Sequence, residues 1–250
     1  MKKIIILFFA ILLYADDIQY YLLTVKVNYK EYADSGKFLD SESSSYSDMK
    51  GIGVRYDADE KIKYFLKGEY VYGSTVYSGS TWDGTFLSEK TNNVYIYNLQ
   101  LGVYPFKNPY YISLGYRFWN RGKGDYSGDY NEKYYWHYAS FGYAYKFIYA
   151  KNSICVDFEY QYAFDPKLNA DLGEGVKVDL GVTDGIKFRI QDSYKYSENV
   201  ILSISYKYQL WHINRSDTVN VNIDGVSIPI YEPESYTRNQ YLGIGFIYKY

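Results

Sequence analysis

Apolar and polar residues alternate along most of the chain. An extended backbone turns successive side chains to opposite faces, so a repeat of two residues predicts β-strands. The clearest stretches are YLLTVKVNY (21–29), IKYFLKGEYVY (62–72), YIYNLQLGV (95–103), SICVDFEYQY (153–162) and VILSISYKYQL (200–210). In the first stretch we place Lys26 on the inner face. The apolar face points outward and carries Tyr21, Leu23, Val25, Val27 and Tyr29.

The polar segments between these strands alternate in length. Short connections occupy residues 57–61, 105–109, 149–153 and 197–199. Long ones occupy residues 34–48, 74–92, 121–133, 165–175 and 214–236. Short turns at one end and long loops at the other are typical of outer-membrane barrels. The pattern predicts an all-β fold, a single antiparallel transmembrane β-barrel of ten strands with short periplasmic turns and long extracellular loops.

Residues 176–196 fit this scheme less simply. One apolar face continues from Val176 to Tyr194, which predicts a single long strand. Asp184 and Asp192 share that outer face. Asp184 could lie above the bilayer, whereas Asp192 requires either a bulge or a position near the periplasmic interface.

Composition agrees with a barrel. The 250 residues include 36 tyrosines, whose apolar ring and polar hydroxyl suit a boundary between lipid and water. The mean hydropathy of −0.38 is compatible with a barrel, because only alternate residues face lipid. The formal net charge of −2 gives no basis for nucleic-acid binding, which needs concentrated basic charge.

The two ends of the sequence carry targeting features. Residues 1–15 combine Lys2 and Lys3 with a short apolar run and Ala15, which predicts a secretory signal peptide followed by a barrel over residues 16–250. Cys155 is the single cysteine, so no intrachain disulfide can form. The last strand should close the barrel against the first. Its outward residues resemble the terminal signal that the barrel-assembly machinery reads in bacterial outer-membrane proteins: Leu242, Ile244, Phe246, Tyr248 and Tyr250.

That resemblance implies the outer membrane of a Gram-negative bacterium, with membrane lipid and lipopolysaccharide as surroundings.

Many charged residues fall on the predicted inner face: Lys26, Arg55, Lys63, Lys67, Glu69, Arg117, Lys146, Asp157, Glu159, Lys187, Arg189 and Lys207. Small barrels are filled by side chains, which favours an ion-paired plug. A narrow anion-preferring channel lined by the excess of basic groups is the alternative.

Catalytic and metal-binding residues are few. His137 and His212 are the only histidines; both are expected to face outward, and neither is followed by serine two residues later. Two histidines on separate strands make a poor metal site, so we expect neither a metal nor a cofactor.

Several segments together resemble the omptins, ten-stranded outer-membrane proteases. They are SLGYRFWNRGKGDYSGDY (113–130), YASFGYAYKFIYAKNSICVDFEYQY (138–162), VILSISYKYQLWHI (200–213) and YLGIGFIYKY (241–250). The chain resembles the Protochlamydia outer-membrane protein family equally well. The omptin resemblance implies a water activated by an Asp–His pair, with an Asp–Asp pair opposite.

The residues that the omptin mechanism requires are missing from the matching positions of this sequence. Ala170 and Leu172 occupy the Asp-x-His positions, and Asp83 stands alone in the second loop. The expectation is therefore an omptin-like surface or structural protein without catalysis and with an unknown extracellular ligand. The alternative is an endopeptidase with a displaced site built from His212 with Asp217 or Asp83.

Overall fold

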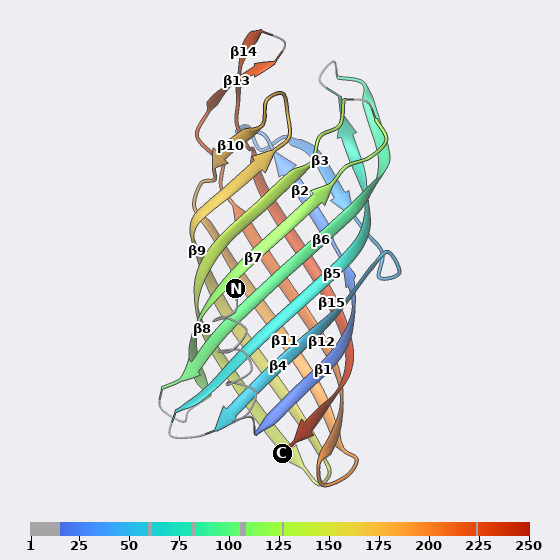
Figure 1. Ribbon diagram of the computed structural model, residues 1–250, viewed down its shortest axis with the longest axis vertical. Coiled ribbons are helices and arrows are strands. Elements are labelled where there is room, and N and C mark those ends of the chain that lie inside the picture. Colours follow the sequence, from blue (N-terminus) through green and yellow to red (C-terminus); the bar gives the residue numbers. More distant parts are fainter. Residues whose placement is uncertain (1–15, 60–61, 82–83, 106–108, 127, 224) are drawn as a thin grey trace, which may run out of the picture.

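The structure, a computed structural model, describes residues 16–59, 62–81, 84–105, 109–126, 128–223 and 225–250. These residues form a closed antiparallel barrel of ten strands (Figure 1), which confirms the predicted fold class. In the described ranges no helix is long and apolar enough to cross a membrane. The predicted signal peptide, residues 1–15, and Asp83 lie outside the described residues.

Two of the ten barrel strands are interrupted, and the other eight are continuous. The first consists of β1 (Asp17–Lys26) with β2 (Asn28–Tyr32), and the second of β3 (Phe38–Ser43) with β4 (Met49–Asp59). The others are β5 (Lys63–Ser80), β6 (Phe86–Tyr104), β7 (Tyr110–Gly122), β8 (Glu132–Tyr149), β9 (Asn152–Ala170), β11 (Thr183–Lys195), β12 (Val200–Ile213) and β15 (Glu234–Lys249).

The first and last barrel strands pair and close the sheet. β1 runs antiparallel to β15 from the pair Asp17 and Lys249 to the pair Lys26 and Gln240. β1 also pairs with β4, and β15 with β12, so both strands are bonded on two sides. Because an unpaired backbone group in lipid costs several kcal/mol, this closure suits the sheet to a membrane.

The two ends of the barrel differ. We call the end with the β4–β5, β6–β7, β8–β9 and β11–β12 connections the turn end, and the opposite end the loop end. At the loop end, β10 (Val176–Asp179) adds to β9. There β13 (Val219–Ile223) and β14 (Val226–Ile230) form a separate hairpin that projects beyond the barrel in Figure 1.

The barrel strands reach further toward the loop end than the sequence indicated. Of two expected long loops, 74–92 is mostly strand, because β5 reaches Ser80 and β6 begins at Phe86. The other, 34–48, contains β3 between turns at 33–37 and 44–48. The N–H of Ala33 donates to the carbonyl of Lys37, and that of Thr81 to Thr85, both at 2.9 Å. β9 likewise runs to Ala170 through the expected loop 165–175. These loop predictions were wrong because strands beyond the lipid can be polar on their outer face.

The expected single strand over residues 176–196 is broken between β10 and β11. Gly181 lies in the break, where an added Cβ would stand 2.5 Å from the carbonyl oxygen of Arg215. Asp192 pairs in continuous register with Ile154 and Ile204, so no bulge is present. It lies two residues from Tyr194, which pairs with the first residue of β9, and this places Asp192 at the turn end.

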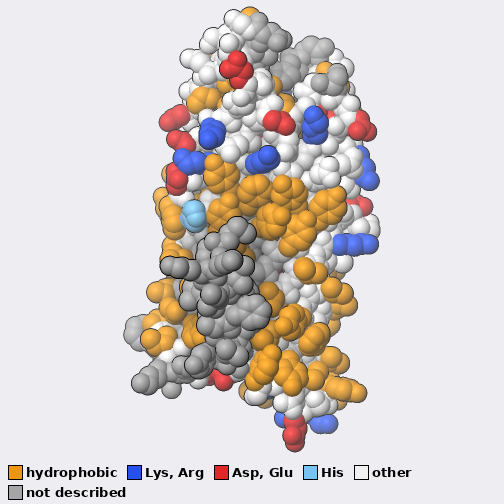
Figure 2. Space-filling view, viewed as in Figure 1, with side chains coloured by type: hydrophobic (Ala, Val, Ile, Leu, Met, Phe, Trp, Pro, Cys, Tyr) orange, Lys and Arg blue, Asp and Glu red, His pale blue; other side chains and the backbone are white. Residues whose placement is uncertain are grey.

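Apolar side chains form a broad belt on the outside of the barrel, orange in Figure 2. Leu22, Leu114 and Ile244 are 60%, 63% and 61% exposed. Outward apolar residues at alternate positions are what a lipid-facing barrel surface requires. Charged side chains lie beyond the belt toward the loop end in Figure 2, and outward Lys30 and Lys133 belong to the strand segments at that end.

The first barrel strand faces the opposite way from our prediction. Tyr21, Leu23, Val25, Val27 and Tyr29 are buried inside the barrel, and Lys26 is exposed on the outside. This prediction was wrong because the lumen contains an apolar layer of its own. Both faces of the strand therefore carry apolar residues, and alternation alone does not identify the outer one.

Candidate functional site

Side chains occupy the lumen in three layers. The inward residues of β7 give the order of these layers. From the turn end to the loop end they are Tyr111, Arg117, Trp119 and Arg121. Tyr111 belongs to a charged network, Trp119 to an aromatic layer, and Arg121 to a cluster of carboxylates.

The mid-barrel network joins barrel strands across the lumen. It contains Lys67, Glu69, Asp157, Glu159, Lys187, Arg189 and Lys207. Glu69 on β5 pairs with Lys67 at 3.0 Å and with Lys207 on β12 at 2.6 Å. All of these charges are buried or nearly so, and buried charges persist in folded proteins when they are paired in this way.

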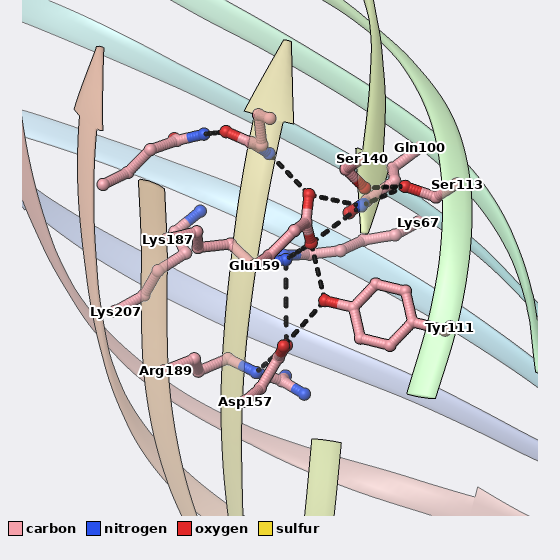
Figure 3. Close-up of polar contacts among 12 residues, drawn as sticks. Lys67, Gln100, Tyr111, Ser113, Ser140, Asp157, Glu159, Lys187, Arg189 and Lys207 are labelled. Carbon is pink, nitrogen blue, oxygen red and sulfur yellow. Dashed lines mark hydrogen bonds and ion pairs between the residues drawn. The ribbon is translucent and has the colours of Figure 1, made fainter. Parts of the chain in front are cut away.

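Glu159 is the most connected carboxylate of the mid-barrel network, and it is completely buried. It pairs with Lys187 and accepts hydrogen bonds from the hydroxyl of Tyr111 and from Gln161 Nε2, both at 2.6 Å. Figure 3 shows Tyr111 and Lys187 approaching Glu159 from different walls of the barrel. Asp157 lies 3.7 Å from Lys187. The network therefore ties β7, β9 and β11 together.

The aromatic layer stands above the network toward the loop end. It consists of Tyr29, Trp119, Tyr134, Trp136, Tyr138 and Trp211, each at most 1% exposed. The rings of Trp136 and Trp211 meet edge to face with centroids 5.0 Å apart, and Trp119 stacks on Tyr134 at 5.0 Å. Such pairs are favourable geometries for aromatic packing. Large side chains thus occupy the lumen above the charged network.

The loop-end cluster consists of Arg121 and the four carboxylates of Glu31, Glu42, Glu132 and Glu232. Arg121 donates to Glu31 at 3.0 Å and to Glu42 at 3.1 Å, and it pairs with Glu132. Glu232 accepts hydrogen bonds from the hydroxyls of Tyr134 and Tyr29 at 2.6 and 3.0 Å. One guanidinium therefore faces four buried carboxylates.

Glu31 and Glu132 are the sequence neighbours of the outward Lys30 and Lys133, in strand segments beyond the apolar belt. Burial raises the pKa of Glu31 to about 7 and that of Glu42 to about 7, and the charge of Arg121 opposes the shift in both. Burial raises the pKa of Glu232 well above its usual value. The cluster can therefore exchange protons near neutral pH.

Two cavities open onto this cluster. One, of about 240 Å³, is lined by Arg121, the four carboxylates and Asp40. The other, of about 210 Å³, has mainly apolar walls that include Leu168, Val176 and Ile230. Tyr130, Glu132, Tyr231 and Glu232 line both. Among the described residues, no group of three or more His, Cys, Asp or Glu side chains is arranged to hold a metal ion.

The predicted lumen charges are distributed along the barrel. Seven of the twelve form the mid-barrel network. Arg55 pairs with Asp57 at 2.7 Å, Lys63 lies 5.3 Å from the ring of Tyr104, and Arg117 is completely buried. Lys146 is exposed near the turn end, and Lys26 lies outside the barrel, so its predicted lumen position was wrong.

In the described part of the chain, no displaced catalytic site forms between His212 and Asp217. This residue faces outward, with Nε2 2.8 Å from Glu234 and Nδ1 3.7 Å from Asp184, and its ring stacks on Tyr236. Asp217 is exposed beyond the end of β12.

The terminal residues Leu242, Ile244, Phe246 and Tyr248 lie on the outer face of β15, and Tyr250 follows its end. They therefore belong to the outer apolar surface, as the sequence indicated.

Sequence reasoning missed the loop-end cluster altogether. Glu42, Arg121, Glu132 and Glu232 fell in segments that were expected to be loops. Glu31 continues the face of Tyr29 two residues further on, and Glu132 precedes Tyr134, Trp136 and Tyr138 at the same spacing of two. That spacing was the available signal that these carboxylates face inward.

Comparisons with known proteins relate the chain to others by structure alone. No family model matches the sequence, and no curated protein matches it. The outer membrane protease OmpT from Escherichia coli is 13% identical, with a TM-score of 0.58 over 94% of this chain and 97% of that one.

Two further structures are less similar. Neisserial surface protein A is 14% identical, with a TM-score of 0.37 over 92% of this chain and 97% of that one. The transport unit of the autotransporter AIDA-I from Escherichia coli is 10% identical, with a TM-score of 0.40 over 93% and 90%. TM-scores below 0.5 do not establish a shared fold. The likeness to OmpT shows the fold: a closed antiparallel β-barrel like that of an outer-membrane protein.

Proposed function

We propose that the chain is a non-catalytic surface protein of the Gram-negative outer membrane, a closed barrel that presents its loop end to the exterior. The observation that carries this proposal is the occupied lumen. The mid-barrel network and the aromatic layer follow one another along the barrel axis, and both are built from buried side chains. The outer apolar belt supports the membrane location.

Conduction is disfavoured by the way in which the inner charges are used. A permeation path needs charged groups that can exchange partners with a passing ion. Lys187 and Lys207 are instead bound to Glu159 and Glu69 and are each 4% exposed. The aromatic layer would have to move as well before an ion could pass.

An omptin-type peptidase is disfavoured by the position of both histidines. A histidine acting as general base must lie within hydrogen-bond reach of a water at the site. His137 packs outward between Tyr116 and Phe164, with ring centroids 5.1 and 6.3 Å away, and His212 also faces outward.

Two assays on one preparation test this proposal. The refolded barrel, identified by its heat-dependent mobility on SDS gels, should give no discrete current steps in planar bilayers. It should also leave a fluorogenic dibasic peptide intact in the presence of lipopolysaccharide. Current steps that change in Lys67→Gln, or cleavage that disappears in His212→Ala, would overturn the proposal.

Surface presentation is tested in cells. An epitope tag inserted after Ser35, in the turn between β2 and β3, should bind antibody on intact cells. The same tag after Glu198, between β11 and β12, is the matched control and should bind only after the membrane is permeabilised. The opposite result would invert the proposed orientation.

A further inference from the structure

Arg117 is a buried cation without a carboxylate partner in the described part of the chain. It faces inward from β7 and is 0% exposed. Its Nη1 donates to Oε1 of Gln209 over 3.5 Å, at the limit for a hydrogen bond, while its Nε and Nη2 have no partner. The guanidinium carbon lies 5.8 Å from the centre of the Trp136 ring.

The charge balance around Arg117 leaves it uncompensated. Arg55, Asp57, Arg117 and the mid-barrel network together place six inward cations against four carboxylates: Arg55, Lys67, Arg117, Lys187, Arg189 and Lys207 against Asp57, Glu69, Asp157 and Glu159. Each of these carboxylates already pairs with another cation. A buried lysine can lose its proton, whereas an arginine keeps its charge. An unpaired buried charge is strongly unfavourable, so Arg117 needs a counter-anion.

A second unpartnered group lies on the strand pair that carries Gln209. Asn239 is 0% exposed, and neither its Oδ1 nor its Nδ2 has a partner in the described residues. Gln209 and Asn239 are directly opposite in the β12–β15 register, and both are buried in the lumen. Side chains opposite each other across two strands start about 5 Å apart. Asn239 therefore faces the lumen on the strand next to Gln209, the residue that Arg117 contacts.

Unused donors predominate in this part of the lumen. The indole Nε1 of Trp136 also lacks a partner, and that ring is the one beside Arg117. The unused N–H groups are thus on Nε and Nη2 of Arg117, on Nδ2 of Asn239 and on Nε1 of Trp136. A set rich in donors and carrying a positive charge matches a small anion.

We propose that Arg117 holds a small inorganic anion of the chloride class inside the barrel, with Asn239 as a second donor. The anion is a resident part of the fold that neutralises a buried charge. It does not permeate the lumen, so this inference stands apart from the proposed surface role and from the channel alternative.

Halide-dependent stability tests the site. The refolded barrel is heated in sodium chloride or in sodium gluconate at equal ionic strength, and the midpoint of its SDS-gel mobility shift is measured. Binding to the folded state alone should raise the wild-type midpoint in chloride by roughly 5 °C at saturating concentrations. Arg117→Gln should abolish the difference. The matched control Arg238→Gln, at an exposed outward arginine, should keep it.

Two further measurements guard against a variant that fails to fold. Asn239→Leu retains the cation but removes the amide donor, so the chloride effect should shrink without disappearing. Bromide soaked into wild-type crystals should give an anomalous peak within about 3.5 Å of the free guanidinium nitrogens, at hydrogen-bond distance. The proposal is overturned if the wild type shows no chloride effect, if Arg117→Gln retains it, or if bromide peaks occur only on the outer surface.

Discussion

Replacing Arg121 by glutamine removes the single guanidinium of the loop-end cluster while retaining a side chain of similar length. Glu31, Glu42 and Glu132 then lose the cation to which each is bound. Because the three carboxylates are buried, their negative charges would be left together without compensation. We expect the variant to be destabilised most at a pH where those carboxylates are ionised.

The size of the pH-dependent loss of stability follows from the pKa values of the wild-type carboxyl groups. Burial in the folded protein raises the pKa of Glu31 and of Glu42 from 4.5 to about 7. A raised carboxyl pKa gives a contribution to stability that is complete below pH 4.5 and is lost as the pH rises through about 7. At about 1.4 kcal/mol per pKa unit, the loss is of the order of 3 kcal/mol for one carboxylate. The combined loss for both carboxylates is less than twice the loss for one, because neighbouring carboxylates titrate together.

Without Arg121 both pKa values should rise further, so the variant should lose about 3–5 kcal/mol of unfolding free energy at pH 8, as expected for a broken buried pair. At pH 5 the carboxylates are protonated, and the loss should be clearly smaller. Urea unfolding followed by tryptophan fluorescence measures both values. Arg215→Gln is the control, because that arginine is 38% exposed and pairs with exposed Asp34, so its loss should stay below about 1 kcal/mol. An equal loss at pH 5 and pH 8 in Arg121→Gln would refute the reasoning.

Three other outcomes are expected. Wild-type unfolding free energy should decrease from pH 5 to pH 8 in urea titrations, and an increase would contradict the raised carboxyl pKa values. Lys187→Met should cost about 3–5 kcal/mol by breaking its pair with Glu159. Adding Glu159→Gln should restore part of that loss, whereas simply additive losses would argue against pairing. Gly53→Ala would place a methyl group 2.2 Å from the Tyr21 ring and should lower the yield of heat-shifting barrel on SDS gels. Gly68→Ala, whose nearest contact is at 3.4 Å, should fold normally, and equal yields for the two variants would count against this packing.

The barrel and much of its charged interior were predictable, because alternation is strict where the outer face meets lipid. Glu159 and Lys187 each lie between outward apolar neighbours, so their inward position follows from the spacing. Which charges pair could not be predicted. Glu69 and Lys207 are 138 residues apart, and only the closed sheet brings them together.

The wrong predictions share a physical cause: the face of a strand that carries the apolar residues changes along the barrel axis. Val25 and Tyr29 line the aromatic layer inside the barrel. The apolar face of their strand therefore points into the lumen, and it was mistaken for the lipid-facing side. Glu42 and Arg121 lie on strand segments beyond the belt, where polar sequence resembles a loop. Neither distinction can be drawn from the alternation of a single strand.

The placement of Glu69 and Lys207 also constrains the order in which the barrel forms. They lie on β5 and β12, which are separated on the shorter way round the barrel by β4, β1 and β15. Before β15 meets β1, these strands belong to the two ends of an open sheet. Lys207, whose carboxylate partner in the described structure is Glu69, must then stay hydrated, because a lone charge in lipid is costly. Seam closure and burial of this ion pair are therefore one cooperative step, in which the last strand seals the inner charges away from water as it completes the wall.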